Sequence, residues 1–362
     1  MPVFPPDPPH ASAADRAACR AAIRAGSKSF FAASLLLPPS VRRSAYGLYA
    51  FCRLSDDAVD EAGGDRAAAL ARLERRLTAA CAGRPEDHPA DRALAEVLAR
   101  HAIPEALPRA LLEGLAWDAR GRRYDTLSDL AAYAARVAGT VGAMMTLAMG
   151  VRDGHALARA CDLGIAMQFT NIARDVGEDA RAGRLYLPRA WLAAEGIDAR
   201  AFLSDPRPGP GLRRVVARLL AAADGLYARA EPGIAALPPA CRPAIRAAGA
   251  IYAEIGRAVE ANDLDSITRR ARVDGGRKAA LLARAALPVF RSPGLAAPPL
   301  PETTFLVAAV LDHPVPARRR LPSWWDVSGQ VVHVLDLIEA LEERDAFRRS
   351  SIVLDTGSRT ML

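Results

Sequence analysis

Two rows of oxygen-bearing side chains fall on single helical faces. In the first, Asp56 and Asp60 are four residues apart within RLSDDAVDE, a spacing that places both carboxylates on one side of a helix. Two carboxylates about 5–6 Å apart repel each other by roughly 3 kcal/mol at an effective dielectric constant of about 20. The first row therefore predicts a cationic partner.

The second row follows an apolar stretch. Within QFTNIARDVGED, the residues Gln168, Asn171, Asp175 and Asp179 are spaced by three, four and four positions, so they share one helical face. Because residues 163–167 just before them are mostly apolar, the polar row begins inside a core. Each buried polar group without a partner costs about 1–3 kcal/mol. An internal ligand would remove that cost.

A hard divalent cation would satisfy both rows. Carboxylate and amide oxygens favour Mg²⁺, with Mn²⁺ as a substitute, over zinc or copper, and Mg²⁺ completes its shell with water and substrate phosphate. A single Asp-x-x-x-Asp pair is usually a solvated surface, whereas two such pairs joined to apolar stripes favour a metal–diphosphate site. The predicted metal ligands are Asp56, Asp60, Asn171, Asp175 and Asp179.

Basic and hydroxyl side chains accompany these rows. Arg53 precedes Asp56 by three residues, and Arg174 stands directly before Asp175. Each arginine could pair with the local carboxylate or hold a diphosphate through two hydrogen bonds. The segment GSKSFF, with Ser27 and Ser29, could hold phosphate oxygens or simply cap a helix.

A segment of small residues that begins at Tyr133 lies between the two rows in the sequence. The segment YAARVAGTVGAMM, residues 133–145, carries Ala or Gly along one side of a helix. This pattern is typical of tight helix packing, and it would equally suit the wall of a hydrocarbon channel. Tyr133, Tyr186 and Tyr252 could supply hydroxyl groups or ring faces that stabilise a carbocation.

Helices must carry these side chains. Aromatic residues make up only 6% of the chain, and the strong helix formers Ala, Leu and Arg dominate over Val, Ile and Thr. We predict an all-α protein in which roughly ten helices form one large bundle. Proline- or glycine-based helix breaks occur at residues 37–39, 63–64, 83–85, 103–104, 153–154, 206–211 and 238–239.

The ends of the chain have a different composition. We predict a disordered proline-rich lead-in over residues 1–13, a catalytic domain over 14–286 and a proline-rich linker over 287–302. A C-terminal extension over 303–362 is expected to hold one helix from about Val327 to Arg348, after the pair Trp324-Trp325. That pair could rest on a lipid interface or pack on the bundle.

The charge and the cysteine content limit the kinds of partner and the cellular compartment that are expected. The net charge of +7 could serve several polyanions, but no basic block is interleaved with aromatic residues, so no nucleic-acid partner is expected. The five cysteines are scattered without a C-x-x-C pair, which suits reduced thiols in the cytoplasm. The longest uncharged apolar run, Val137 to Val151, is shorter than the roughly 20 residues of a bilayer span. A soluble chain, or one attached to a membrane surface, is expected.

Five segments together resemble the squalene/phytoene synthase family. They are, in order, SKSFFAASLLLP, YGLYAFCRLSDDAVDE, YAARVAGTVGAMM, QFTNIARDVGEDARAGRLYLP and IYAEI, and the resemblance covers about residues 14–285. It implies the isoprenoid synthase fold, a single helical bundle with a central cavity and two facing aspartate-rich helices. The catalytic residues it implies are Asp56, Asp60, Tyr133, Asp175 and Asp179. The diphosphate-binding residues it implies are Ser27, Ser29, Arg53, Gln168, Asn171, Arg174, Tyr186, Tyr252, Arg270 and Lys278.

The resemblance also implies a reaction. Two geranylgeranyl diphosphates would condense head-to-head through a cyclopropyl diphosphate to phytoene, releasing diphosphate, with Mg²⁺ and without NADPH. One alternative is a C15-using relative that makes dehydrosqualene, squalene or presqualene diphosphate. Another is a non-catalytic helical scaffold or membrane-surface adaptor. A cytoplasmic enzyme is expected, with peripheral contact at the inner face of the membrane and handover of product to a downstream desaturase.

Overall fold

The computed structural model describes residues 11–60, 65–287, 297–313 and 315. The chain divides into two compact units. Asp7–Pro314 form one, and Met1–Pro6 with Val315–Leu362 form the other. The second of these lies almost wholly outside the described residues, as does the helix expected near Val327 to Arg348. All helices below belong to the first unit.

The described part of this unit is entirely helical, as the sequence predicted. Roughly ten helices were expected, and the higher number arises partly because short helices of six to eight residues carry too little periodicity to be recognised. The helices are α1 (Ala13–Gly26), α2 (Lys28–Ser34), α3 (Pro39–Asp60), α4 (Arg66–Cys81), α5 (Pro89–His101), α6 (Ala106–Ala119), α7 (Leu127–Ala134), the π-helix η1 (Ala135–Gly139), α8 (Thr140–Ala148), α9 (Gly154–Arg181), α10 (Arg189–Ala194), α11 (Ala199–Ser204), α12 (Pro210–Ala236), α13 (Arg242–Ala261), α14 (Gly275–Ala285), the 3₁₀ helix η2 (Pro301–Thr303) and α15 (Thr304–Leu311).

The predicted breaks coincide with helix ends. The Asp153 side chain accepts a hydrogen bond from the backbone N–H of Ala156 and caps α9. Pro210 stands at the first position of α12, where its missing N–H costs nothing. α12 ends at Ala236, just before the pair Pro238-Pro239.

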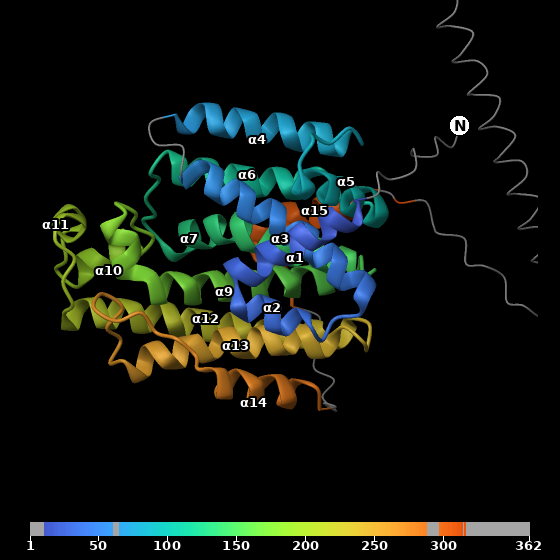
Figure 1. Ribbon diagram of the computed structural model, residues 1–362. Coiled ribbons are helices and arrows are strands. Elements are labelled where there is room, and N and C mark those ends of the chain that lie inside the picture. Colours follow the sequence, from blue (N-terminus) through green and yellow to red (C-terminus); the bar gives the residue numbers. More distant parts are fainter. Residues whose placement is uncertain (1–10, 61–64, 288–296, 314, 316–362) are drawn as a thin grey trace, which may run out of the picture. The chain divides into compact units, whose positions relative to one another are not determined.

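Helix α9 lies in the middle of the bundle (Figure 1), between α12, α13 and α14 on one side and α6, α5 and α4 on the other. Its side chains are buried on most faces, including Phe169 and Ile172. The second polar row is therefore carried by the most central helix, and α3 brings the first row to the same region.

Small residues allow α9 to approach η1 and α8 very closely. A Cβ atom on Gly164 would lie 2.4 Å from the carbonyl oxygen of Ala138, and one on Gly142 would lie 2.3 Å from that of Ala160. Val141 and Met145, on the same stretch, line an apolar cavity. The tight packing predicted for the small-residue segment is therefore confirmed, and another side of the segment lines a cavity. That this cavity holds a hydrocarbon stays a prediction.

Gly164→Ala is expected to destabilise the fold by about 1–3 kcal/mol, because the new methyl group meets backbone atoms that cannot move aside. Gly225→Ala on α12 is the matched control. A Cβ atom there meets nothing within 4 Å, and removing a helical glycine should stabilise by up to about 1 kcal/mol. Urea denaturation measures both changes, and equal stabilisation by the two substitutions would contradict the close helix contact.

The helical stretch Leu127–Ala148 is long and apolar enough to cross a membrane by length and composition alone, and 61% of its most apolar window is buried inside the bundle. It is longer than the run Val137 to Val151 on which the sequence estimate rested. Since this stretch makes the close contact with α9 and lines a cavity, burial within the bundle accounts for its apolar character.

The last residues of the expected linker already contact the bundle. The buried Arg159 donates hydrogen bonds to the carbonyl oxygens of Ala297 (2.8 Å) and Pro298 (3.3 Å), and it pairs with the buried Asp162 at 2.8 Å. α15 then packs against α9, α6 and α8. This short helix was not expected from the sequence.

At the other end, the structure describes the last residues of the expected lead-in. Ser12 caps α1 through a reciprocal pair of hydrogen bonds with Asp15. The backbone N–H of Ala11 donates to Glu96 at 2.7 Å. Ala11 and Ser12, which were predicted to belong to a disordered lead-in, therefore have defined contacts with the bundle.

Candidate active site

A polar cavity of about 330 Å³ lies between α3 and α9. Both predicted rows reach it, since Asp56 and Asp60 come from α3, and Asp175 and Asp179 come from α9. The spacing of four residues within each pair turns both carboxylates of a helix toward the same space. The two aspartate pairs therefore face one cavity, as predicted.

Arginines neutralise the carboxylates on each helix. Arg53 donates to Asp57 at 2.9 Å and lies 3.8 Å from Asp56. Arg174 donates to Asp175 at 2.8 Å, and Arg270 reaches the same carboxylate at 2.9 Å. Arg53 and Arg174 therefore form local ion pairs, which was one of the two roles predicted for them. Both side chains also line the cavity, where a diphosphate would be within their reach. Their contact with diphosphate stays a prediction.

One guanidinium connects the two helices. Arg184 donates to Asp60 of α3 at 2.9 Å and lies 3.7 Å from Asp179 of α9. A single side chain can touch both only if the helices face each other at short range. Arg184 also lines the cavity, where its charge suits a departing diphosphate.

The carboxylates differ in their electrostatic environment. Burial raises the pKa of Asp179 to about 7, although Arg184 opposes the shift. Burial and the nearby Asp60 raise the pKa of Asp56. Burial would also raise the pKa of Asp175, but hydrogen bonds from Arg174 and Arg270 outweigh it and lower this pKa. Asp56 and Asp179 thus have only a distant arginine each, at 3.8 and 3.7 Å, whereas two arginines donate hydrogen bonds to Asp175.

Another wall of the cavity carries the carboxylate of Asp118 from α6 and two phenols, Tyr133 from α7 and Tyr186 from the loop after α9. Tyr133 donates to one oxygen of Asp118 at 2.7 Å, and Tyr186 donates to the other at 2.8 Å. The two rings stack with their centroids 5.1 Å apart. All three side chains line the polar cavity.

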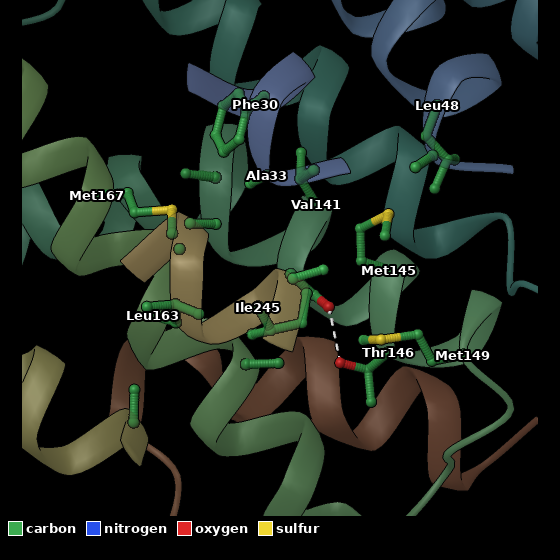
Figure 2. Close-up of a pocket in the computed structure, with 18 of the residues that line it drawn as sticks. Phe30, Ala33, Leu48, Val141, Met145, Thr146, Met149, Leu163, Met167 and Ile245 are labelled. Carbon is green, nitrogen blue, oxygen red and sulfur yellow. Dashed lines mark hydrogen bonds between the residues drawn. The ribbon is translucent and has the colours of Figure 1, made fainter. Parts of the chain in front are cut away.

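An apolar cavity of about 310 Å³ adjoins the polar one, because Gln168 and Asn171 line both. Figure 2 shows side chains from several helices around it, including Phe30, Leu48 and Met145. The hydroxyl of Thr146, also on this wall, donates to the carbonyl of Gly142 at 2.9 Å. The wall therefore offers little hydrogen bonding to an occupant.

Positions on α9 measure how far this cavity extends. Lining residues run from Asn171 at the polar end through Leu163 to Ala156. At 1.5 Å per residue, this separation of fifteen residues spans about 22 Å. A long hydrocarbon chain could therefore lie along α9 with its charged end among the aspartates.

The structure brings most of the predicted site residues together. Those that line the polar cavity are Arg53, Asp56, Asp60, Tyr133, Gln168, Asn171, Arg174, Asp175, Asp179 and Tyr186. Arg270, on a loosely matched segment, contacts Asp175.

The remaining predicted residues lie outside the polar cavity lining. Ser27 caps α2, which was one of the two roles predicted for its segment. The side chains of Ser27 and Asn171 both lie beside the Tyr252 hydroxyl. Ser29 also lies on α2, and Lys278 lies on α14. Neither lines either cavity within the described residues. Their diphosphate roles stay predictions without a contact to support them.

Two charged residues of the polar cavity, Asp118 and Arg184, were not predicted from the sequence. Asp118 continues the buried stripe Leu107, Leu111 and Leu115 of α6 at a spacing of three, and an acidic group on such a stripe was the available signal. Arg184 lies after the end of α9, where spacing does not predict direction. Its placement depends on how the chain turns back toward α3.

The donors around the cavity fit a magnesium site. The side-chain oxygen Oδ1 of Asn171 is buried and has no hydrogen-bond partner among the described residues, which a metal ion would supply. No cluster of three or more acidic, His or Cys side chains able to hold a metal occurs in the described part of the chain. The donor set thus suits ions shared with a substrate diphosphate rather than an ion held by protein alone.

Several known proteins are similar to this chain in sequence and in fold. The squalene/phytoene synthase profile matches residues 23–277. A phytoene synthase of Rhodobacter capsulatus is 56% identical over 304 residues, covering 82% of this chain and 90% of the relative. One of Cereibacter sphaeroides is 53% identical over 314 residues, covering 82% and 88%. The crystal structure of a dehydrosqualene synthase in complex with ligand has a TM-score of 0.67 at 32% identity, covering 75% of this chain and 95% of that one.

The chain belongs to the squalene/phytoene synthase family. The all-α fold is that of its isoprenoid synthases, as expected from the five motifs. In this chain, two aspartate-bearing helices face a polar cavity, and an apolar cavity adjoins it. These two features are the basis for a function.

Proposed function

We propose that the protein is a phytoene synthase, a prenyltransferase that condenses two geranylgeranyl diphosphates head-to-head. The observation that carries this proposal is the junction at Gln168 and Asn171, where a cavity lined by acids and arginines meets a long apolar cavity. A prenyl diphosphate has the same two parts. The identities of 53–56% to bacterial phytoene synthases support the assignment.

We propose Mg²⁺ as the cofactor, held by Asp56, Asp60, Asn171, Asp175 and Asp179, with Mn²⁺ as a substitute. When bound, it supplies positive charge that stabilises the departing diphosphate. Arg53, Arg174 and Arg184 line the same cavity and would bind the remaining phosphate oxygens. The apolar walls exclude water, which would otherwise capture an allylic cation. No NADPH is expected to be needed.

The length of the apolar cavity supports the C20 substrate. The span of about 22 Å along α9 leaves room for a chain of four isoprene units. A C15-using relative remains the second candidate, because the matched crystal structure is that of a dehydrosqualene synthase.

Substrate comparison tests the assignment. The purified protein is incubated with Mg²⁺ and either geranylgeranyl or farnesyl diphosphate, and the hydrocarbon is identified by mass spectrometry. We expect phytoene from the C20 substrate, loss of product with EDTA, and recovery when Mg²⁺ is restored. A product from the C15 substrate alone would overturn the chain length, and no product from either would favour a scaffold.

We also propose a cytoplasmic location with peripheral contact at the inner face of the membrane. All five cysteines are free thiols, which suits a reducing compartment. A lipophilic product would benefit from direct transfer to a membrane and a downstream desaturase. Cell fractionation tests this location, and recovery of the protein solely in the soluble fraction at low salt would contradict the contact.

A further inference from the structure

The proposed condensation must release protons as well as diphosphate. When the cyclopropyl ring closes, one C–H bond breaks and its electron pair enters the new ring. When the hydrocarbon forms, a second C–H bond breaks and its electrons complete the central double bond. Each step therefore needs a proton acceptor near the reacting carbons.

Most carboxylates in the polar cavity are already engaged. Asp175 is paired with two arginines, and Asp60 is paired with Arg184. Asp56 and Asp179 belong to the proposed metal ligands. Asp118 is the remaining cavity carboxylate of the described residues, and it lies on the wall formed by α6.

The partners of Asp118 are two hydroxyl groups. Tyr133 and Tyr186 donate to its two oxygens at 2.7 and 2.8 Å, and in the described residues no cation hydrogen-bonds to it. Arg184, Asp56 and Asp179 are the charged groups that act on it through space. A phenol that faces a cavity and donates to a buried carboxylate can accept a proton while passing on its own.

We propose, on the basis of the proposed function, that Asp118 with Tyr133 and Tyr186 is a proton relay for the condensation. The proton from the breaking C–H bond passes to the phenol oxygen of Tyr133 or Tyr186. That phenol gives its own proton to the Asp118 carboxylate. Asp118 is deprotonated again by the released diphosphate, so each step transfers one proton and leaves the relay unchanged.

The electrostatics of the three groups agree with this role. Burial raises the pKa of Asp118 to about 6, although both phenol hydrogen bonds oppose the shift. At neutral pH the carboxylate is therefore largely ionised, and its basicity lies close to the working pH, where general-base catalysis is efficient. Burial also raises the pKa of Tyr133 and of Tyr186, so both phenols keep the protons that they must donate.

Asp118→Asn tests the relay, because asparagine keeps the shape and one acceptor oxygen but cannot take up the proton. We expect kcat for hydrocarbon formation to fall about 100-fold with an unchanged KM. At saturating Mg²⁺, which would keep the proposed ligand Asp179 ionised, kcat of the parent enzyme should decline as pH falls through about 6, and this decline should vanish in the variant. Asp118→Glu should recover part of the activity.

A second set of variants does not depend on the Asn substitution folding. The ring of Tyr124 packs against both relay phenols, with centroids 5.3 Å from Tyr133 and 6.2 Å from Tyr186, yet its own hydroxyl has no hydrogen-bond partner among the described residues. Tyr124→Phe is therefore the matched control for the double variant Tyr133→Phe/Tyr186→Phe. The double variant should lose activity as Asp118→Asn does, and Tyr124→Phe should retain it.

The outcomes separate the relay from the function on which it rests. A folded Asp118→Asn variant that keeps more than about one-third of kcat, with the decline near pH 6 intact, would overturn the relay, as would an active double phenylalanine variant. A parent enzyme that makes no hydrocarbon from any prenyl diphosphate would instead overturn the proposed function.

Discussion

Asp56→Asn and Asp175→Asn are each expected to lower kcat about 100- to 1,000-fold, because each removes one charge that the proposed metal–diphosphate site needs. The two residues come from different helices, α3 and α9, and both line the polar cavity. Asparagine has nearly the same size as aspartate, so the cavity shape is kept. Steady-state assays of diphosphate release at saturating Mg²⁺ measure the loss.

Asp224→Asn provides the control for a charge change without a site effect, since Asp224 is exposed on α12. Its activity should match the parent enzyme. Circular dichroism must show that all three variants fold. Folded variants at positions 56 and 175 with full activity would remove the basis for a magnesium–diphosphate site between α3 and α9.

Ala160→Phe is expected to lower kcat/KM for geranylgeranyl diphosphate about 10- to 100-fold while farnesyl diphosphate is still accepted. Ala160 lines the apolar cavity eleven residues before Asn171 on α9, or about 16 Å from the polar junction. The added ring fills the part of the cavity that only a longer chain needs. Forcing the chain past it costs about 1–3 kcal/mol, as overpacking does in cores.

Competition between the two substrates gives the clearest measurement of this change, because both meet the same protein in one reaction. Ala221→Phe, on the exposed surface of α12, is the control for adding a phenyl ring. Equal losses for the C15 and C20 substrates in Ala160→Phe would mean that the ring disturbs the fold or that the chains lie elsewhere.

The aspartate rows were predictable because helical spacing alone determines which side chains share a face. Asp56 with Asp60, and Asn171 with Asp175, needed only the correct helix assignment. The meeting of the two rows at one cavity could not come from spacing, and it entered through the family resemblance. Arg184 was missed because its position depends on the turn after α9, where the chain leaves the helix.

Tertiary packing also decided features that the sequence left open. The small residues of 133–145 pack against α9 and line a cavity at the same time, which periodicity could not separate. Arg159, which is paired with the buried Asp162, donates hydrogen bonds to the carbonyl oxygens of Ala297 and Pro298. Nothing in the local sequence of residues 297–302 indicates that contact, since Arg159 lies more than a hundred residues earlier.

The stoichiometry of diphosphate release tests the central claim most directly. Purified protein with Mg²⁺ and geranylgeranyl diphosphate should release two diphosphates for each phytoene formed, and EDTA should stop both. The ratio reports two ionisations in one site, as head-to-head condensation requires. Diphosphate release without a C40 hydrocarbon, or hydrocarbon formation that continues in EDTA, would contradict the account.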